Sequence, residues 1–278
     1  MLEIKNVTFS YAGIKKSGIK NISLSVKQGE CILLCGASGC GKNTLTRLIN
    51  GLIPHFFKGE LKGEVIVKDK KIEEQQLYNL AGLVGSVFQN PRSQFFSVDT
   101  DGEITFGAEN IGLPKAEILK RKRAVVKELN LQSLMGRSLF DLSGGEKQKI
   151  ACGSVAELLP EIIILDEPSS NLDRESILEL REMMKLWKGK GKTLIISEHR
   201  LWYVKDVIDR AVFMEEGEIK GEWSRKEFNA LSEEELISYE LRPVSFEKVE
   251  EKFYFKENTV STENKSFPGE IYLKDFYF

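Results

Sequence analysis

A glycine-rich segment between an apolar run and a helical pattern constrains this chain more than any other feature. The segment spans residues 36–44 and reads Gly-Ala-Ser-Gly-Cys-Gly-Lys-Asn-Thr. Residues 32–34 before it are apolar and predict a buried strand, and Leu45, Leu48 and Ile49 after it have helical spacing. A strand, a glycine loop and a helix N-terminus together present backbone N–H groups and positive potential to a phosphate. The segment is therefore predicted to be a phosphate-binding loop.

Each residue of this loop is predicted to contribute to binding a nucleotide, namely Gly36, Ala37, Ser38, Gly39, Cys40, Gly41, Lys42, Asn43 and Thr44. Lys42 supplies a positive charge for the β- and γ-phosphates of ATP. Asn43 departs from the usual pattern, which has a Ser or Thr hydroxyl for Mg²⁺ at this position. An amide oxygen is an acceptable hard ligand, but Mg²⁺ demands tight octahedral geometry. The loop predicts ATP and Mg²⁺ as cofactors, Asn43 as a metal ligand, and hydrolysis as the step that Asn43 puts in doubt.

Composition and charge set broader limits. The chain has 278 residues, is 41% hydrophobic and 29% charged, and carries a net charge of −2, which gives no polybasic signal for nucleic acid or anionic lipid. No apolar run approaches the ~18 residues of a membrane span, and Glu3, Lys5 and Asn6 interrupt the start as they would not in a signal peptide. The four cysteines form no CxxC pair and are predicted to be reduced, buried thiols.

The apolar pattern predicts an α/β fold. Alternating residues predict strands near the N-terminus at 2–11, 19–26 and 63–67. Continuous apolar runs at 162–165 and 193–197 predict buried parallel strands, and helical patterns cover 113–131 and 176–187. The expected fold is a P-loop ATPase core with a mainly parallel sheet and an N-terminal antiparallel β region.

The residue composition and the apolar pattern of the chain change after residue 223. Residues 1–223 are predicted to form the nucleotide-binding domain, and residues 224–268 a C-terminal extension and linker that begins with a Glu-rich helical stretch. Residues 271–278 then repeat the pattern of residues 2–9, with Lys274 matching Lys5 and Phe278 matching Phe9. Residues 269–278 are therefore predicted to be the first strand of a second, truncated copy of the domain, the alternative being a chance amphipathic strand.

Two acids follow the apolar run at 162–165. In an open α/β sheet, ligands bind beyond the carboxyl ends of the strands, which is where Asp166 and Glu167 are expected. Asp166 is predicted to bind magnesium directly or through water, and Glu167 to polarise a water for attack on the γ-phosphate. The alternative is a buried strand that ends in a solvated acidic turn.

The signature segment, residues 142–149, reads Leu-Ser-Gly-Gly-Glu-Lys-Gln-Lys. Ser143 and Glu146 have the spacing of a capping box, which predicts a helix start. Gly144 and Gly145 remove side chains from the first turn and leave N–H groups suited to an anion. Because a cap and a phosphate site are compatible, Ser143, Gly144, Gly145 and Glu146 are predicted to bind nucleotide.

In this order the motifs resemble the ATP-binding subunit of an ABC transporter, over residues 2–221. The resemblance implies a helical subdomain around the signature segment, and a loop at 171–173 that communicates across a dimer. It further implies that Tyr11 stacks on adenine, Gln89 touches magnesium and the attacking water, and His199 contacts the γ-phosphate. A strand aromatic, a polar loop and a capping histidine are the respective alternatives. The implied catalytic residues are Lys42, Gln89, Glu167 and His199, and the implied metal ligands are Asn43, Gln89 and Asp166.

Residues 88–96, Phe-Gln-Asn-Pro-Arg-Ser-Gln-Phe-Phe, are similar to those of energy-coupling-factor importers, which take up vitamins, their precursors or metal ions such as cobalt and nickel. Some peptide and metal importers carry similar segments. The resemblance implies a peripheral protein at the cytoplasmic face of the membrane, with no nucleic acid partner. Its implied partners are a second ABC domain (a tandem copy or a homodimer), a transmembrane coupling component and a substrate-binding membrane component.

The membrane partner is expected to dock near residues 89–96, with Phe95 or Phe96 facing outward. Two other functions compete with this transport ATPase. One is a regulatory half that no longer hydrolyses ATP, which Asn43 favours and Glu167 and His199 oppose. The other is a soluble ABC protein of ribosome or DNA metabolism. The acidic residues within 224–268 oppose the ribosome type, and the sequence has no heptad run for the coiled coil of the DNA-repair type.

Overall fold

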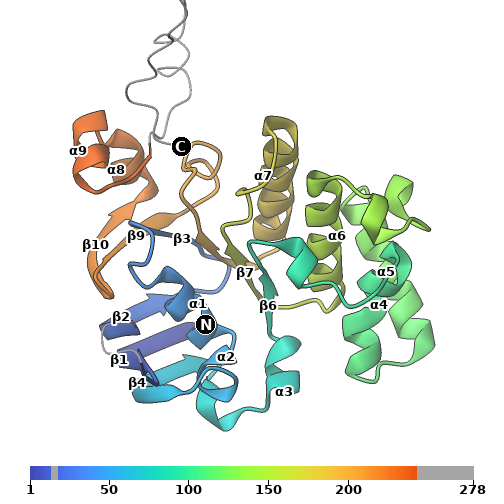
Figure 1. The fold of residues 1–278 in the computed structure, drawn as a ribbon, viewed down its shortest axis with the longest axis horizontal. Helices are drawn as coiled ribbons and strands as arrows, with labels where there is room; N and C mark the ends of the chain where they lie inside the picture. Colours follow the sequence, from blue (N-terminus) through green and yellow to red (C-terminus); the bar gives the residue numbers. More distant parts are fainter. Residues whose placement is uncertain (14–17, 243–278) are drawn as a thin grey trace, which may run out of the picture. The chain divides into compact units, whose positions relative to one another are not determined.

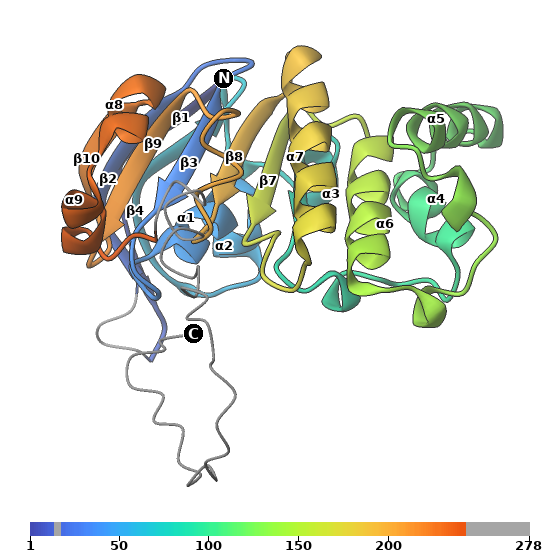
Figure 2. The ribbon, with the colours of Figure 1, turned by 90° about the horizontal axis from the view of Figure 1, so that it is seen from above.

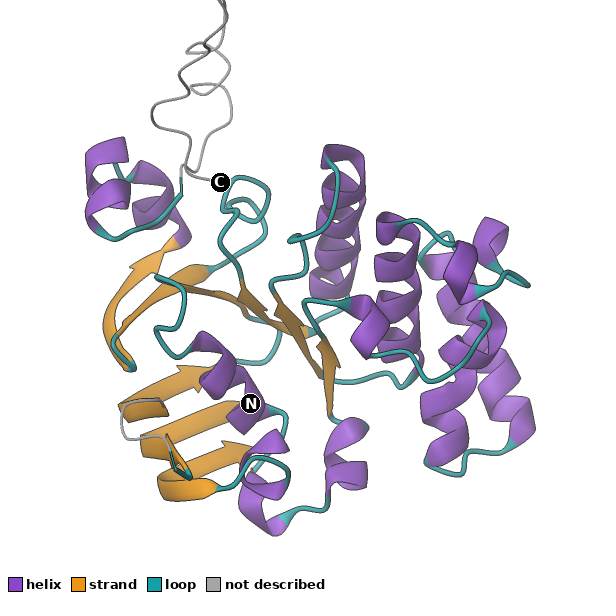
Figure 3. Cartoon of the chain, viewed as in Figure 1, coloured by secondary structure: helices purple, strands orange, loops and turns teal. Residues whose placement is uncertain are grey.

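The computed structural model describes residues 1–13 and 18–242, and these residues form two sheets with helices around them (Figures 1 and 3). The strands are β1 (Leu2–Tyr11), β2 (Gly18–Val26), β3 (Cys31–Cys35), β4 (Gly59–Val67), β5 (Lys70–Lys71), β6 (Val84–Val87), β7 (Ile162–Asp166), β8 (Thr193–Ser197), β9 (Arg210–Glu215) and β10 (Glu218–Ser224). The α-helices are α1 (Lys42–Ile49), α2 (Leu52–His55), α3 (Leu77–Ala81), α4 (Thr100–Asn110), α5 (Lys115–Glu128), α6 (Gly144–Glu157), α7 (Arg174–Gly189), α8 (Arg225–Ala230) and α9 (Glu233–Ser238).

The strand directions in the two sheets agree with the prediction of an antiparallel N-terminal region and a mainly parallel sheet. The N-terminal sheet is antiparallel, in the order β2-β1-β4-β5. The second sheet has the order β10-β9-β3-β8-β7-β6, in which β10 alone runs antiparallel to its neighbour. The loops that follow β3, β6, β7 and β8 therefore leave the sheet at one edge, where ligands of such sheets bind.

Strand β3 is apolar throughout because both of its faces are covered. Ile32 and Leu34 belong to a core shared with α1 and the N-terminal sheet, whereas Leu33 belongs to a core shared with α4, α6 and α7. Figure 2 shows this division, with α1 toward the N-terminal strands and α6 and α7 beyond β7. A strand buried on both faces lacks polar alternation, which is why its sequence reads as a continuous run.

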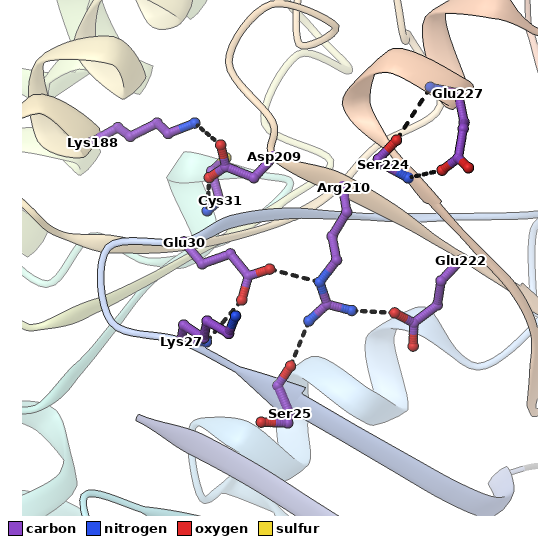
Figure 4. Close-up of polar contacts among 10 residues, drawn as sticks. All are labelled: Ser25, Lys27, Glu30, Cys31, Lys188, Asp209, Arg210, Glu222, Ser224 and Glu227. Carbon is purple, nitrogen blue, oxygen red and sulfur yellow. Dashed lines mark hydrogen bonds and ion pairs between the residues drawn. The ribbon is translucent and has the colours of Figure 1, made fainter.

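Arg210 at the start of β9 joins the two sheets (Figure 4). Its Nε lies 2.6 Å from Glu30 Oε1, its Nη1 pairs with Glu222 of β10, and its Nη2 donates to the carbonyl of Ser25 in β2. One planar guanidinium thus satisfies acceptors from both sheets, a geometry that lysine does not reproduce.

Helices α8 and α9, which follow β10, belong to the same compact unit as the strands before them. Helices α8 and α9 confirm the helical pattern, and each begins with a capping box. Phe228 and Leu236 are buried, and Tyr239 packs against Phe213 and Trp223. Burial of these side chains explains why a polar, Glu-rich sequence still packs on the sheet.

Residues 243–278 lie outside the described part of the chain, and so do most of the predicted linker and the predicted repeat strand at 269–278. Within residues 1–13 and 18–242, no helix combines the length and the apolar character needed to cross a membrane.

Candidate functional site

The phosphate-binding loop connects β3 to α1 as predicted. At Gly36, with a φ of 136°, a Cβ atom would lie 2.1 Å from the carbonyl oxygen of Met214, so a side chain has no room there. Lys42 is buried, and its Nζ donates to the carbonyls of Gly36 at 2.8 Å and Ala37 at 2.9 Å. These contacts fold the ammonium group back over the loop, where phosphate oxygens can replace the carbonyls as its acceptors.

The acid at the end of β7 fits a magnesium site. Asp166 Oδ1 is buried and makes no hydrogen bond of good geometry with the described residues; burial raises the pKa of this carboxyl, and the neighbouring Ser197 hydroxyl partly offsets that rise. A buried carboxylate oxygen without a partner is costly unless a cation compensates it. Asn43, in the first turn of α1, is half-buried. Asp166, Asn43 and Gln89 are the residues that would bind Mg²⁺, which prefers oxygen ligands of this kind.

Glu167 receives contacts from two loops that are far apart in the sequence. Gln89 Nε2, which follows β6, donates to Glu167 Oε2 at 2.9 Å. His199 Nε2, which follows β8, lies 3.3 Å from Glu167 Oε1. Three predicted catalytic residues are therefore in direct contact beyond the carboxyl ends of their strands.

The backbone and the local charges fix this cluster. Glu167 has a left-handed φ of 43°, and its N–H donates to the carbonyl of Ser197 at 2.8 Å. Burial lowers the pKa of His199, Lys42 lowers it further, and Glu167 opposes them. The lowered pKa favours the neutral imidazole, which can donate a hydrogen bond to Glu167 when its proton is on Nε2.

Glu198 has a positioning role that the sequence patterns did not reveal. This buried carboxylate accepts from the N–H groups of His199 at 2.7 Å and Arg200 at 3.0 Å through Oε1. Its Oε2 accepts from the hydroxyl of Tyr203 at 2.6 Å and from the N–H of Ser169. Glu198 thus fixes the backbone that presents His199 and ties it to the segment after Glu167.

The signature segment starts α6 with the predicted capping box. Ser143 Oγ accepts from the N–H of Glu146 at 3.2 Å, and Glu146 accepts from the N–H of Ser143 at 2.7 Å. Gly145 has a packing role as well, because a Cβ atom there would lie 2.1 Å from Ser176 Oγ at the start of α7. The glycine therefore provides close contact between two helices in addition to a first turn without side chains.

Replacing Gly145 by alanine is expected to destabilise the chain by about 1–3 kcal/mol, since the new methyl group would displace Ser176 and α7. Gly189→Ala, at the end of α7, is the control, because no atom lies within 4 Å of the position that its Cβ atom would take. Urea unfolding of the two variants, and of Gly145→Ala combined with Ser176→Gly, measures the difference. Failure of Ser176→Gly to restore stability would refute this explanation.

Three segments border one cavity of about 380 Å³. Gln89 and Arg92 line it from the loop after β6, Gly144 and Lys147 from α6, and Asn171 from the segment that ends at Asp173. Asp173 caps α7, with its Oδ1 accepting from the N–H of Ser176 at 2.8 Å. The structure therefore brings the predicted dimer-contact loop beside both Gln89 and the signature segment.

Tyr11 lies beside the phosphate-binding loop. Its hydroxyl oxygen is 3.2 Å from Thr44 Oγ1, and its ring makes an edge contact with Phe9 at 4.9 Å. The structure thus places the predicted adenine-binding residue next to the loop, whereas stacking on a base stays a prediction.

Comparisons with known proteins agree on the family. The ABC transporter profile matches residues 19–170. Two curated relatives from Treponema denticola, provisionally named ABC transporter ATP-binding proteins, are 54% and 41% identical over 242 residues, or 87% of this chain. The match covers 50% and 49% of these relatives, so the chain spans about half their length.

Solved structures give the same result. The structure of CbiO1 from Clostridium perfringens, described as part of the ABC transporter complex CbiONQ, has a TM-score of 0.72 and 30% identity over 85% of this chain and 92% of its own. A dimeric ATP-binding cassette with ADP and phosphate has a TM-score of 0.70 and covers 81% of this chain and 99% of its own, but at 24% identity it supports the fold alone.

This chain belongs to the ABC transporter family. Members of this family contain ATP-binding cassettes that bind ATP with Mg²⁺ and act as ATPases coupled to transport. The predicted fold class is confirmed by the match to solved cassettes.

Proposed function

We propose that this chain binds and hydrolyses ATP to energise a membrane importer of a vitamin, a vitamin precursor or a metal ion. The observation that carries the proposal is the contact of Glu167 with both Gln89 and His199. A general base needs to be oriented as well as basic, and two independent loops orient this carboxylate. The proposal is tested by the release of phosphate from ATP, measured with Mg²⁺ and again with excess EDTA.

Each residue of the site has a role in this proposal. Lys42 and the loop N–H groups bind the phosphates, and Glu167 accepts a proton from the attacking water. Gln89 orients that water, and neutral His199 donates a hydrogen bond to the γ-phosphate. Mg²⁺ at Asp166 and Asn43 would neutralise charge on the β- and γ-phosphates.

We further infer that the chain is one cassette of a two-cassette protein. The relatives from Treponema denticola are about twice as long as the matched region, and residues 271–278 repeat the pattern of residues 2–9. The second cassette would cover the phosphate-binding loop with its own signature segment. An alternative arrangement is a homodimer of this chain.

The importer class rests on two observations. Residues 88–96 have the Gln-Asn-Pro pattern of energy-coupling-factor importers, and CbiO1, which is 30% identical, is part of a CbiONQ complex. The proposed location is the cytoplasmic face of the membrane, with a transmembrane coupling component and a substrate-binding membrane component as partners. A regulatory cassette without hydrolysis is the second candidate, because Asn43 occupies the position of the metal-binding hydroxyl.

Replacing Asn43 by serine is expected to raise ATP hydrolysis by about tenfold and to lower the Mg²⁺ concentration needed for half-maximal rate. The shorter hydroxyl suits octahedral coordination at the start of α1 better than the longer amide. Steady-state phosphate release across a Mg²⁺ titration measures both effects. Asn79→Ser, at an exposed position of α3, is the control. An unchanged Mg²⁺ titration in Asn43→Ser would refute the metal argument.

A mostly apolar groove of about 330 Å³ is the proposed docking site for a cytoplasmic helix of the coupling component. Phe96, 74% exposed, stacks on Phe106 of α4 at 4.8 Å, whereas Phe95 packs into the core. Buried Glu103 accepts from the N–H groups of Phe96 and Ser97 at 2.9 Å and so fixes this segment. An exposed aromatic ring on a fixed backbone is a suitable interface anchor.

Phe96→Ala is expected to lower transport by the assembled complex by about tenfold or more while leaving ATP binding unchanged, because aromatic anchors dominate interface energies. Val98→Ala is the matched control, since Val98 is 64% exposed but does not line the groove. Uptake by vesicles and calorimetry with ATP measure the two properties. Equal effects of both substitutions on transport would exclude the groove as the docking site.

A further inference from the structure

Arg47 of α1 links the phosphate-binding loop to strand β1. Its Nη1 donates to the hydroxyl oxygen of Tyr11 at 3.1 Å, and that oxygen lies 3.2 Å from Thr44 Oγ1. The guanidinium carbon of Arg47 also lies 4.3 Å from the ring centroid of Phe57. Thr44, Tyr11 and Arg47 thus form a continuous polar chain, and Phe57 fixes its far end.

The direction of these hydrogen bonds follows from their chemistry. Arginine can only donate, so the hydroxyl oxygen of Tyr11 accepts from Arg47. The phenolic proton is then available for donation to Thr44 Oγ1. The hydroxyl of Tyr11 is therefore satisfied from two sides, and its rotation is fixed relative to the loop.

The ring of Tyr11 is restrained as well. It makes edge contacts with Phe9 at 4.9 Å and with Phe57 at 6.1 Å, at interplanar angles of 81° and 88°. Arg47 in turn is placed by α1 and by its contact with the face of Phe57, a favourable cation–π geometry. Removing Arg47 would leave Tyr11 with one polar partner and a looser ring.

We propose that Arg47 is a positioning residue that orients Tyr11 for recognition of the nucleotide base and joins base recognition to the phosphate-binding loop. The inference rests on the proposed function, in which Tyr11 contacts adenine. Preorganisation of the ring lowers the entropy lost when a base stacks on it. The role proposed for Arg47 is therefore exerted on the base through Tyr11. Its charge also reaches Asp166, where burial raises the pKa of the carboxyl and Arg47 partly offsets that rise.

Calorimetry with ATP and with inorganic triphosphate, which lacks the base, separates an effect on base binding from an effect on phosphate binding. Arg47→Met keeps the aliphatic stem and a helix-compatible side chain but removes the donor and the charge. This variant is expected to bind ATP about five- to tenfold more weakly, as the loss of one hydrogen bond and its ordering predicts, and to bind triphosphate within about twofold of the unmutated chain. Arg47→Lys, which keeps the charge and a donor, is expected to recover at least half of the lost affinity.

A double-mutant cycle distinguishes positioning of Tyr11 from a general structural role of Arg47, because only positioning makes the effect of Arg47→Met on ATP affinity depend on the Tyr11 hydroxyl. In a Tyr11→Phe background the hydroxyl is absent, so Arg47→Met is expected to have little further effect on ATP affinity. If Arg47→Met weakens ATP and triphosphate binding equally, or does not weaken ATP binding, the proposed role of Arg47 is wrong, whereas the proposed ATP-binding function is unaffected. Failure of the unmutated chain to bind ATP would overturn the proposed function as well.

Discussion

Glu167→Gln is expected to lower ATP hydrolysis by about 100-fold or more while leaving ATP affinity within about twofold, because a general base contributes about 10²–10⁴ to the rate. Glutamine has the shape of glutamate, so its Oε1 can still accept from Gln89 Nε2, which donates to Glu167 at 2.9 Å. What it loses is the ability to take a proton from water. Phosphate release and calorimetry measure the two properties on the same preparation.

The matched control for this prediction is Glu161→Gln, which changes an acid at the opposite end of β7 that pairs with Lys68. It is expected to leave the rate unchanged. ATP is also expected to increase the dimer population of Glu167→Gln, because two chains that close around ATP no longer separate after hydrolysis. Light scattering detects this dimer. A Glu167→Gln rate above about one tenth of the unmutated rate would exclude Glu167 as the base.

Glu157→Met is expected to raise the free energy of unfolding at pH 8 by about 3 kcal/mol. Glu157, the last residue of α6, is fully buried, and neither carboxyl oxygen has a hydrogen-bond partner within residues 1–13 and 18–242. Burial raises the pKa of this carboxyl to about 7. Among charged neighbours, Glu109 of α4 and Glu117 of α5 raise this pKa further and Arg121 of α5 lowers it.

The raised pKa of Glu157 makes the free energy of unfolding fall as the pH rises. As the pH rises above 4.5, the unfolded chain loses this proton first, whereas the folded chain keeps it until about pH 7. Glu157 therefore makes the folded state progressively less stable between about pH 4.5 and 7, at ~1.36 kcal/mol for each pKa unit.

Denaturant unfolding of the chain and of Glu157→Met at pH 5 and pH 8 tests this expectation. The stabilisation by methionine is expected to be larger at pH 8 than at pH 5. Exposed Glu109→Gln serves as the control for removing a nearby acid without filling the buried site. A gain that is the same at both pH values would show that Glu157 does not ionise in this interval.

The elements predicted from the sequence are those with a strong local pattern. The loop at 36–44, the run at 162–165 and the capping box at Ser143 depend on residues that are neighbours in the chain. Strand β6 was not predicted, because Val84-Gly-Ser-Val87 has no apolar run of useful length. Its Gly85 is explained only by tertiary packing, since a Cβ atom there would lie 2.4 Å from Val155 of α6.

Residues that act by positioning others were not predicted either. Glu198 is adjacent to His199 in sequence, yet its importance arises from contacts with Ser169 and Tyr203. Arg47 meets Tyr11 across 36 residues of sequence. No local pattern encodes such contacts, because they depend on how the two sheets and α1 pack together.

The central claim is that the loop at 36–44 and the cluster around Glu167 form one ATP site. Isothermal titration of ATP into the unmutated chain and into Lys42→Ala, with Mg²⁺ present, tests it most directly. The unmutated chain is expected to bind one ATP, and Lys42→Ala, which loses the buried ammonium group of the loop, is expected to bind it at least about tenfold more weakly. No ATP binding by the folded unmutated chain, or equal binding by both, would contradict the claim.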